Sequence, residues 1–452
     1  MKQGRKIDMT QGPIMRDVLI FALPIIISNI LQYLYTTVDT LVIGRFCGTT
    51  SLAAVGTSAQ PVEVMLCVFL GVGTGASIRI SHHTGAGDKC RMRDTTRSSI
   101  SFVYLSGIPI GVLGYLATPL ILKFMGVPED VWDAALTYTR IVFIGALGNI
   151  GFNMNAGILR GMGDSNASLY FLIISCIANI VLDLTLVAGL GMDVSGAALA
   201  TSCAMYLSWF FSIMYIRRRY PELAYTWLPH GIVWRELKRI LMIGLPIGLN
   251  NSLFSFGHMA MQALVNAQGS TFMAGNSIAN RVSGLSNIAI SAMSAAASTF
   301  SGQNYGANRI DRLRWGYMRI PFTSGALTFI FGVICIALRR PILGLFSSEE
   351  LVLFYASRFV VVTLLGQWMF AVFSSMCAIV NGTGHVRYTT LANLLMLWAV
   401  RLPVAWLITR FYDGKWVMVS FPISFGFGML YMLIFYLVSP SWKKIINSSS
   451  EG

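Results

Sequence analysis

Apolar segments long enough to cross a lipid bilayer recur along the whole of this sequence, and they constrain its fold more than any other feature. Residues 169–190 and 418–438 are two examples. A helix of roughly twenty apolar residues spans a hydrocarbon core of roughly 30 Å. Only 12% of the 452 residues are charged and 55% are hydrophobic, whereas a soluble chain carries about 25% charged residues. The sequence therefore predicts an all-α polytopic membrane protein.

Twelve segments are expected to be transmembrane helices. They cover residues 14–43, 51–78, 98–122, 131–157, 166–189, 195–216, 238–266, 272–300, 316–338, 350–380, 387–409 and 416–438. The first follows a polar tail and continues at spanning length, without a small-residue cleavage site, so we expect it to be retained. The seven cysteines are scattered singly without a CxxC pair, which favours apolar packing over metal ligation or disulfides.

The basic residues between these segments predict the orientation of the chain. With both termini in the cytoplasm, most Lys and Arg fall in the two tails, in 79–97, 217–239 and 309–319, and at Arg160 and Arg387. The opposite loops contain only Arg45, Lys123, Arg339, Arg340, Arg410 and Lys415. Because positive residues favour the cytoplasmic side, we expect a multi-pass membrane protein with both termini in the cytoplasm. The net charge of +14 then needs no nucleic-acid partner.

The two halves of the chain resemble each other. A shift of 221 positions aligns GTTSLA at 48–53 with GSTFMA at 269–274, Gly85-Ala86 with Gly306-Ala307, and Gly161 and Gly163 with Gly382 and Gly384. One gap earlier, ALPIIISN at 22–29 matches GLPIGLNN at 244–251. Six spans separate equivalent points, so two six-helix lobes related by a parallel repeat are expected, as in many transporters. The predicted domains are an N-terminal lobe (1–216), a cytoplasmic linker (217–237), a C-terminal lobe (238–440) and a cytoplasmic tail (441–452).

Several of these motifs resemble the multidrug and toxic compound extrusion (MATE) transporters. They are MTQGPI at 9–14, FALPIIISNILQYLYTTVDTLVIGRFCG at 21–48, LAAVGTSAQP at 52–61, GILRGMGD at 157–164, NIVLD at 179–183 and SGAALAT at 195–201. The sequence looks closest to the prokaryotic branch named after DNA-damage-inducible protein F. This resemblance implies alternating access and export of organic, often cationic, compounds in exchange for Na⁺ or H⁺, with no other cofactor. The glutamate that other branches carry in the seventh span is here Phe254.

Three acids lie well within the predicted spans, and all three are in the first half: Asp39, Glu63 and Asp183. Ionisable groups at bilayer depth are costly unless paired or hydrated, so each is a functional candidate. At about 1.5 Å per residue, Asp39, Asp183 and Thr201 fall roughly 6–10 Å below the outer boundary. Asn179 lies one turn from Asp183 on the same helix face.

The first-lobe cation site of the family maps onto Asp39, Asn179, Asp183 and Thr201 in this sequence. Carboxylate, amide and hydroxyl oxygens suit Na⁺, whereas repulsion between two carboxylates would let one of them carry an exchangeable proton. The sequence leaves Na⁺ and H⁺ open. The alternative is that Asn179 and Asp183 only join helices by hydrogen bonds.

A second set of polar residues is expected to line a substrate cavity, with ordinary polar packing as the alternative for each: Gln32, Tyr35, Glu63, Asn153 and Asn155. Arg281 and Arg401 lie within second-half spans, where pairing across helices competes with ligand binding. His82 and His83 fall in a basic loop and are expected to be solvated.

Other functions remain open at this point. A lipid-linked oligosaccharide flippase of the same superfamily would also have two lobes, but usually with a strongly cationic cavity for pyrophosphate. A membrane-embedded enzyme is disfavoured because no paired His/Glu motif, GxSxG or nucleophile–base spacing occurs. The expected partners are a small organic cation and the bilayer, without an obligate protein partner.

Overall fold

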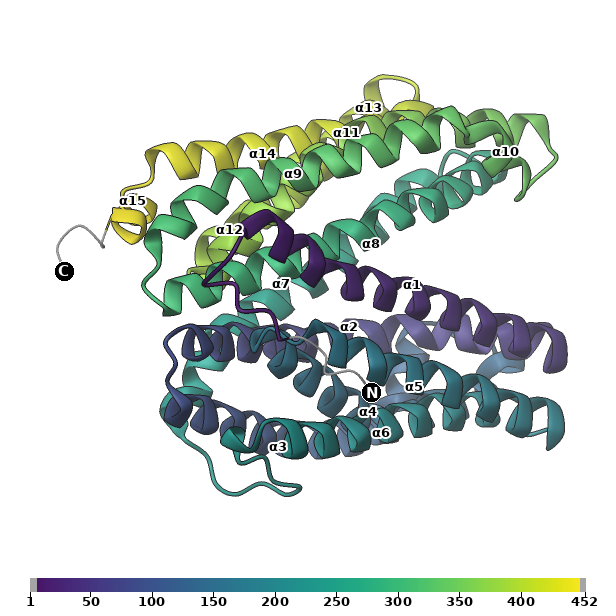
Figure 1. Cartoon of the computed structure of the whole chain (residues 1–452). Helices are drawn as coiled ribbons and strands as arrows, with labels where there is room; N and C mark the ends of the chain where they lie inside the picture. The colour runs from purple at the N-terminus through teal and green to yellow at the C-terminus, as the bar shows by residue number, and fades with distance from the viewer. Residues whose placement is uncertain (1–5, 448–452) are drawn as a thin grey trace. The chain divides into compact units, whose positions relative to one another are not determined.

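The computed structural model describes residues 6–447, and within them every regular element is a helix (Figure 1). The first half contains α1 (Ile14–Phe46), α2 (Gly48–Gly85), α3 (Lys89–Phe124), α4 (Glu129–Gly161), α5 (Ser165–Asp183) with the π-helix η1 (Leu184–Gly189), and α6 (Asp193–Arg219). A short 3-10 turn, η2 (Pro221–Leu223), lies in the connection to the second half.

The second half repeats this order. It contains α7 (Trp234–Asn266), α8 (Ser270–Gly306), α9 (Ile310–Ala337), the short α10 (Arg339–Gly344) and α11 (Glu350–Gly382). Next come α12 (Val386–Leu394), the π-helix η3 (Leu395–Arg401) and α13 (Leu402–Phe411), which run on as one long helix. The chain ends with η4 (Gly414–Val419), α14 (Ser420–Val438) and α15 (Pro440–Asn447).

Ten of these helices are long and apolar enough to cross a membrane. The two further predicted spans correspond to α2 and α8, which have 38 and 37 residues but are rich in Gly, Ser, Thr and Ala. Small residues let helices pack closely inside a membrane protein, where lipid contact is limited. The predicted fold class, an all-α polytopic membrane protein, is confirmed.

The chain divides into two compact units, and α1 and α7 each contribute to both. Unit 1 takes Leu23–Leu249 with residues 6–8, and unit 2 takes Met9–Ala22 with the residues from Asn250 onward. Each change of unit falls close to a proline within the helix, Pro24 in α1 and Pro246 in α7. Proline removes one helical hydrogen bond and weakens the helix at that point. The lobe limits expected near residues 216 and 238 stay a prediction.

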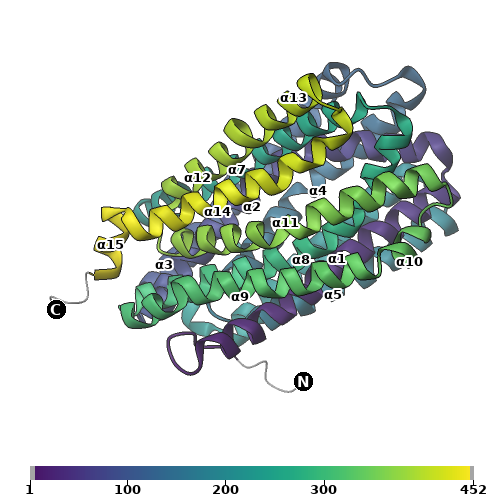
Figure 2. The same cartoon turned by 90° about the horizontal axis from the view of Figure 1, so that it is seen from above.

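Each unit packs around one central helix. In unit 1, α4 contacts α2, α3 and α6, and in unit 2, α11 contacts α8, α9 and α14. Figure 2 shows α9, α11 and α14 side by side. These elements occupy the same order in their halves, so the repeat in sequence is also a repeat in packing.

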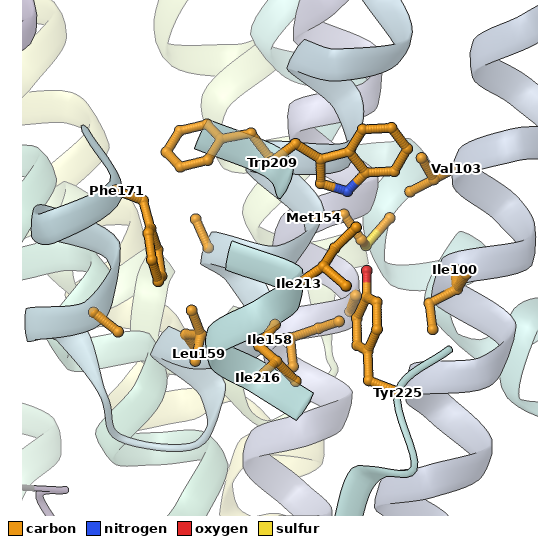
Figure 3. Close-up of a cluster of buried hydrophobic side chains, with 14 of the residues drawn as sticks. Ile100, Val103, Met154, Ile158, Leu159, Phe171, Trp209, Ile213, Ile216 and Tyr225 are labelled. Atoms are coloured by element: carbon orange, nitrogen blue, oxygen red, sulfur yellow. The ribbon is translucent and has the colours of Figure 1, made fainter. Parts of the chain in front are cut away.

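The core of unit 1 is an apolar cluster beside α4 (Figure 3). Trp209 and Ile213 of α6, Met154 and Ile158 of α4, and Phe171 of α5 belong to it. Glycines spaced by three residues on α4 face α6 here, and a Cβ on Gly151 would collide with the Trp209 ring. The close approach of α4 and α6 therefore depends on residues without side chains.

A second close contact ties the first part of α7 into unit 1. Gly71 and Gly75 of α2 lie against Gly244 and Gly248 of α7, so each helix presents a GxxxG pair. A Cβ on Gly75 would lie 2.6 Å from the carbonyl oxygen of Ile240. Such pairs allow helix backbones to pack in direct contact.

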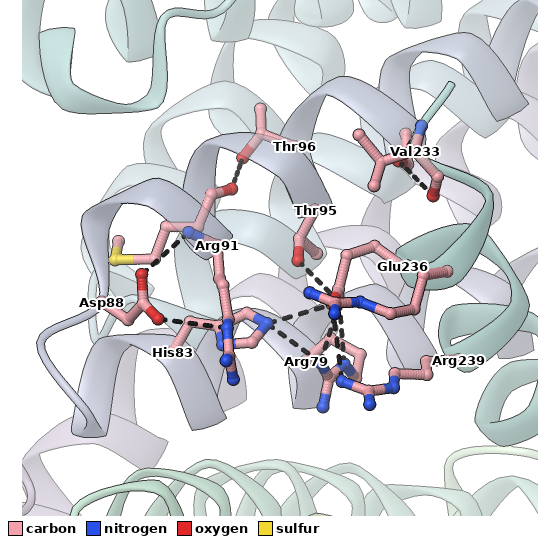
Figure 4. Close-up of polar contacts among 12 residues, drawn as sticks. Arg79, His83, Asp88, Arg91, Thr95, Thr96, Val233, Glu236 and Arg239 are labelled. Atoms are coloured by element: carbon pink, nitrogen blue, oxygen red, sulfur yellow. Dashed lines mark hydrogen bonds and ion pairs between the residues drawn. The ribbon is translucent and has the colours of Figure 1, made fainter.

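A buried ion-pair network lies beside this contact (Figure 4). The Glu236 carboxylate is fully buried and accepts hydrogen bonds from Arg79 Nη2 at 2.8 Å and Thr95 Oγ1 at 3.3 Å. His83 Nε2 lies 3.4 Å from the same oxygen, and Arg239 Nη1 lies 3.6 Å from the other. The expectation that His83 is solvated is wrong, because its ring packs against an acid 153 residues away.

The segment that begins at Met9 is held in unit 2 by hydrogen bonds. Met9 N donates to Gln303 Oε1 at 3.0 Å, and Asn304 Nδ2 donates to the Met9 carbonyl at 3.0 Å. The Arg312 guanidinium donates to the carbonyls of Met9 and Gly12 at 3.1 and 2.9 Å. These bonds explain why residues 9–22 belong to unit 2 although they precede α2 in sequence.

We expect Gly75→Ala to destabilise the protein, because the new methyl group would force α2 and α7 apart. Overpacking of this kind costs about 1–3 kcal/mol. Gly56→Ala is the matched control, since it lies in α2 with nothing within 4 Å of a Cβ. Thermal unfolding in detergent should show a lower Tm for Gly75→Ala alone. Equal Tm values for the two variants would contradict the close α2–α7 contact.

We also expect Glu236→Gln to lower stability by about 3 kcal/mol, because it leaves the largely buried Arg79 guanidinium without its counter-charge. Glu129→Gln, in the exposed first turn of α4, serves as the control. Urea unfolding monitored by tryptophan fluorescence measures both. A Glu236→Gln variant as stable as the control would show that the network contributes nothing.

Candidate functional site

The predicted ion-coupling residues come together in unit 1 from three helices. Asn179 and Asp183 lie one turn apart on α5, and both are 0% exposed. Asn179 Nδ2 donates to Oγ1 of Thr201 on α6 at 3.4 Å. Asp39 on α1 is half-buried, and its carboxyl lies within hydrogen-bonding reach of the Asp183 carboxyl. Four residues separated by up to 162 positions therefore form one cluster, which we call the carboxylate cluster.

Two tyrosines border the carboxylate cluster. The Tyr35 hydroxyl, one turn from Asp39 on α1, contacts the Thr201 side chain. Tyr138 of α4 lies within electrostatic range of both carboxyls. Tyr35 was expected to line a substrate cavity. Tyr138 was not predicted, because a tyrosine in an apolar helix carries no signal that distinguishes it from core packing.

Four oxygens of the carboxylate cluster lack hydrogen-bond donors. Asp39 Oδ1, Asn179 Oδ1 and both carboxylate oxygens of Asp183 are buried without a hydrogen-bond partner. Buried polar atoms are nearly always satisfied, so four unsatisfied acceptors at one place require an explanation. Oxygen acceptors of this kind match the ligands of a hard cation, and the adjacent carboxyls also match a shared proton.

The other candidate substrate residues are dispersed through unit 1. Gln32 on α1 and Glu63 on α2 are exposed. Asn153 donates to the Asn149 carbonyl at 2.9 Å. Asn155 is fully buried, donating to Ser212 Oγ and accepting from the Tyr225 hydroxyl at 2.7 Å, which leaves no surface for a substrate.

The two arginines of the second half differ from each other. Arg281 on α8 is exposed. Arg401, at the end of η3, is 1% exposed and donates from Nε to Ser424 Oγ at 2.9 Å. Among residues 6–447, no carboxylate forms an ion pair with it.

The MatE family model matches this chain twice, over residues 24–185 and 246–407. The second match begins and ends 222 residues after the first, from 24 to 246 and from 185 to 407. This confirms the parallel repeat predicted from the sequence.

Relatives extend the match over almost the whole chain. Probable multidrug resistance protein YoeA of Bacillus subtilis is 28% identical over 95% of this chain and 94% of its own. DNA damage-inducible protein F of Escherichia coli is 27% identical over 82% and 81%. The crystal structure of MATE in complex with MaD3S has a TM-score of 0.87 at 21% identity and covers 99% of both chains, which shows the shared fold. The resemblance inferred from the motifs is confirmed, and the chain belongs to the MatE family.

Proposed function

We propose that this protein is a secondary active antiporter that exports organic, often cationic, compounds in exchange for Na⁺ or H⁺. The observation that carries the proposal is the carboxylate cluster, with four buried oxygen atoms that lack donors. The names of its relatives as multidrug resistance proteins support drug export. The proposed location is the bacterial inner membrane with both termini in the cytoplasm, supported by the distribution of Lys and Arg.

The chemistry of coupling follows from the adjacent carboxyls. Two carboxylates at hydrogen-bonding distance repel each other unless a cation lies between them or one of them holds a proton. Asn179 and Thr201 add neutral oxygens that complete a coordination shell for Na⁺. Either ion removes the repulsion, so the cluster is more stable when occupied.

Occupancy of this cluster would change the packing of three helices. Its ligands come from α1, α5 and α6, so an ion that holds the ligands together also holds those helices together. An ion shifts a conformational equilibrium only by its difference in affinity for the two states. We infer that the state with α1, α5 and α6 drawn together binds the ion more tightly and the substrate less tightly, which produces exchange.

Three polar residues of unit 1 are proposed to contact substrate. Gln32 and Tyr35 lie on α1, two turns and one turn before Asp39, and Glu63 adds a carboxylate on α2. A negative side chain favours a cationic solute, whereas a flippase for a pyrophosphate-linked sugar requires positive ones.

We expect Asp39→Asn and Asp183→Asn each to reduce gradient-driven efflux by about tenfold or more, because either removes one of the coupled charges. Proteoliposomes loaded with a fluorescent organic cation measure this under a Na⁺ gradient and a H⁺ gradient imposed separately. Asp133→Asn, an exposed acid of α4, should transport as wild type. If the wild type exported the cation at a rate independent of both gradients, antiport would be excluded and the lipid-linked oligosaccharide flippase would be favoured.

Variants of the neutral residues Asn179 and Thr201 distinguish Na⁺ from H⁺ as the coupling ion. Na⁺ needs several oxygens, whereas a proton needs one carboxyl. If Na⁺ is the coupling ion, Asn179→Ala and Thr201→Val should weaken its apparent affinity by about tenfold. If the ion is H⁺, the same variants should retain most H⁺-driven efflux. Titration of efflux against Na⁺ concentration and against pH makes the comparison, and wild-type Na⁺ affinity in both variants would exclude them as ligands.

A further inference from the structure

Unit 2 contains a cavity of about 550 Å³ that sequence analysis did not predict. Small-molecule sites in proteins commonly have volumes of about 300–1,000 Å³. Helices α7, α8, α11 and α14 and the end of η3 form its walls, and every lining residue belongs to unit 2. We call this space the unit 2 cavity.

Polar side chains reach the unit 2 cavity from two helices at helical spacing. On α8 they are Asn280, Ser283, Asn287 and Ser291, at steps of three, four and four residues. On α11 they are Thr363, Gln367 and Ser374, which also lie on one face. Residues at such spacing share a side of a helix. No Asp or Glu lies among the lining residues of this cavity.

Arg401 is the one permanent charge in the lining of the cavity. Its guanidinium carbon lies 4.9 Å from the ring centroids of Phe421 and Phe425, and 5.7 Å from that of Phe254. These cation–π contacts and the bond to Ser424 hold the group in place. Nη2 nevertheless remains buried without a hydrogen-bond partner.

A guanidinium in this situation is suited to an anion. It offers five N–H donors in a planar fork that matches a carboxylate, and an intramembrane charge without a counter-charge is costly. The aromatic rings around Arg401, with Phe370 also in the lining, provide apolar walls for a flat ligand.

The internal repeat allows Arg401 to be compared with the equivalent position in the first half. The two family matches differ by 222 residues, which pairs Asn179 with Arg401, whereas the 221-residue shift of the glycine motifs pairs Asn179 with the adjacent Val400. The 222-residue offset pairs Asp183 with Ala405. The second half thus has a cation at or next to the position where the first half has Asn179 of its carboxylate cluster.

We propose that the unit 2 cavity binds organic anions, specifically aromatic carboxylates, through an ion pair with Arg401. The ring of the ligand would lie against the phenylalanines, and the amides of α8 and α11 would bond its polar substituents. This site is separate from the carboxylate cluster, and binding to it requires no ion gradient. The proposal therefore stands apart from the proposed antiport.

The test uses 2-naphthoate as the probe and neutral 2-naphthamide as its isosteric control. Isothermal titration with the purified full-length protein in neutral detergent measures both affinities. We expect the wild type to bind 2-naphthoate about tenfold more tightly than 2-naphthamide, since hydrogen bonds to charged groups contribute that much. Arg401→Gln should abolish the preference and Arg401→Lys should keep part of it, because it retains the charge without the planar fork.

Arg281→Gln is the matched control, since it removes an exposed arginine of α8 that does not line the cavity. It should bind 2-naphthoate with the affinity of the wild type, and so should Asp39→Asn. A loss of transport in Asp39→Asn would then be independent of binding in the unit 2 cavity. If Arg401→Gln does not fold, Ser291→Phe replaces it as the test. This variant keeps the guanidinium but fills the cavity, and it must lose the preference for 2-naphthoate binding.

Three results would overturn the proposal. Equal affinity of the wild type for 2-naphthoate and 2-naphthamide would remove the role of charge. Unchanged binding in folded Arg401→Gln, or in Ser291→Phe where that variant replaces it, would place the ligand elsewhere. Loss of 2-naphthoate binding in nanodiscs containing phosphatidylglycerol, but not in phosphatidylcholine nanodiscs, would identify a lipid headgroup as the occupant.

Discussion

The cost of holding polar atoms away from water is the constraint on which the rest of this structure depends. Most buried charged groups of the described chain meet that cost with partners inside the protein. Glu236 is surrounded by Arg79, His83 and Thr95. Asp164 caps α5 and also accepts hydrogen bonds from two tyrosine hydroxyls, at 2.8 and 2.7 Å.

Buried polar atoms without a hydrogen-bond partner occur at several places in the described chain, Glu236 Oε1 and Arg140 Nε among them, and two of these places are the proposed sites. One is the carboxylate cluster, where both oxygens of Asp183 lack donors. The other is Arg401, where Nη2 lacks an acceptor. Unsatisfied polar atoms inside a membrane protein are retained at functional sites, since a structural role would be served better by an apolar residue. The same physical rule therefore motivates both proposals, without reference to the relatives.

Several features could be predicted from the sequence because they depend on local or periodic properties. Span positions follow from apolar length, and the common depth of Asp39 and Asp183 follows from the constant rise of a helix. The polar stripes of α8 and α11 have the same regularity and could have been found by the same means.

Other features depend on contacts between distant residues, which local sequence does not specify. The burial of His83 depends on Glu236, 153 residues away. The division of α7 between two units depends on which helices its glycines contact. A GxxxG pattern in the sequence does not identify the helix that it will contact. For Arg401 the sequence left pairing across helices and ligand binding open, and in the structure aromatic rings and a serine hydroxyl surround it.

The two selected sites also share a backbone feature. Among residues 6–447, π-helices occur at Leu184–Gly189 and at Leu395–Arg401, in the fifth long helix of each half. Asp183 immediately precedes the first, and Arg401 ends the second. A π-turn carries one extra residue and is less stable than α-helix, so it is retained mainly where function uses it. A ligand bound at either charge would therefore act on the part of its helix that changes geometry most easily. A shift of 222 residues carries Leu184–Gly189 onto residues 406–411 of α13, so each half has its weakened turn at a different place in the repeat.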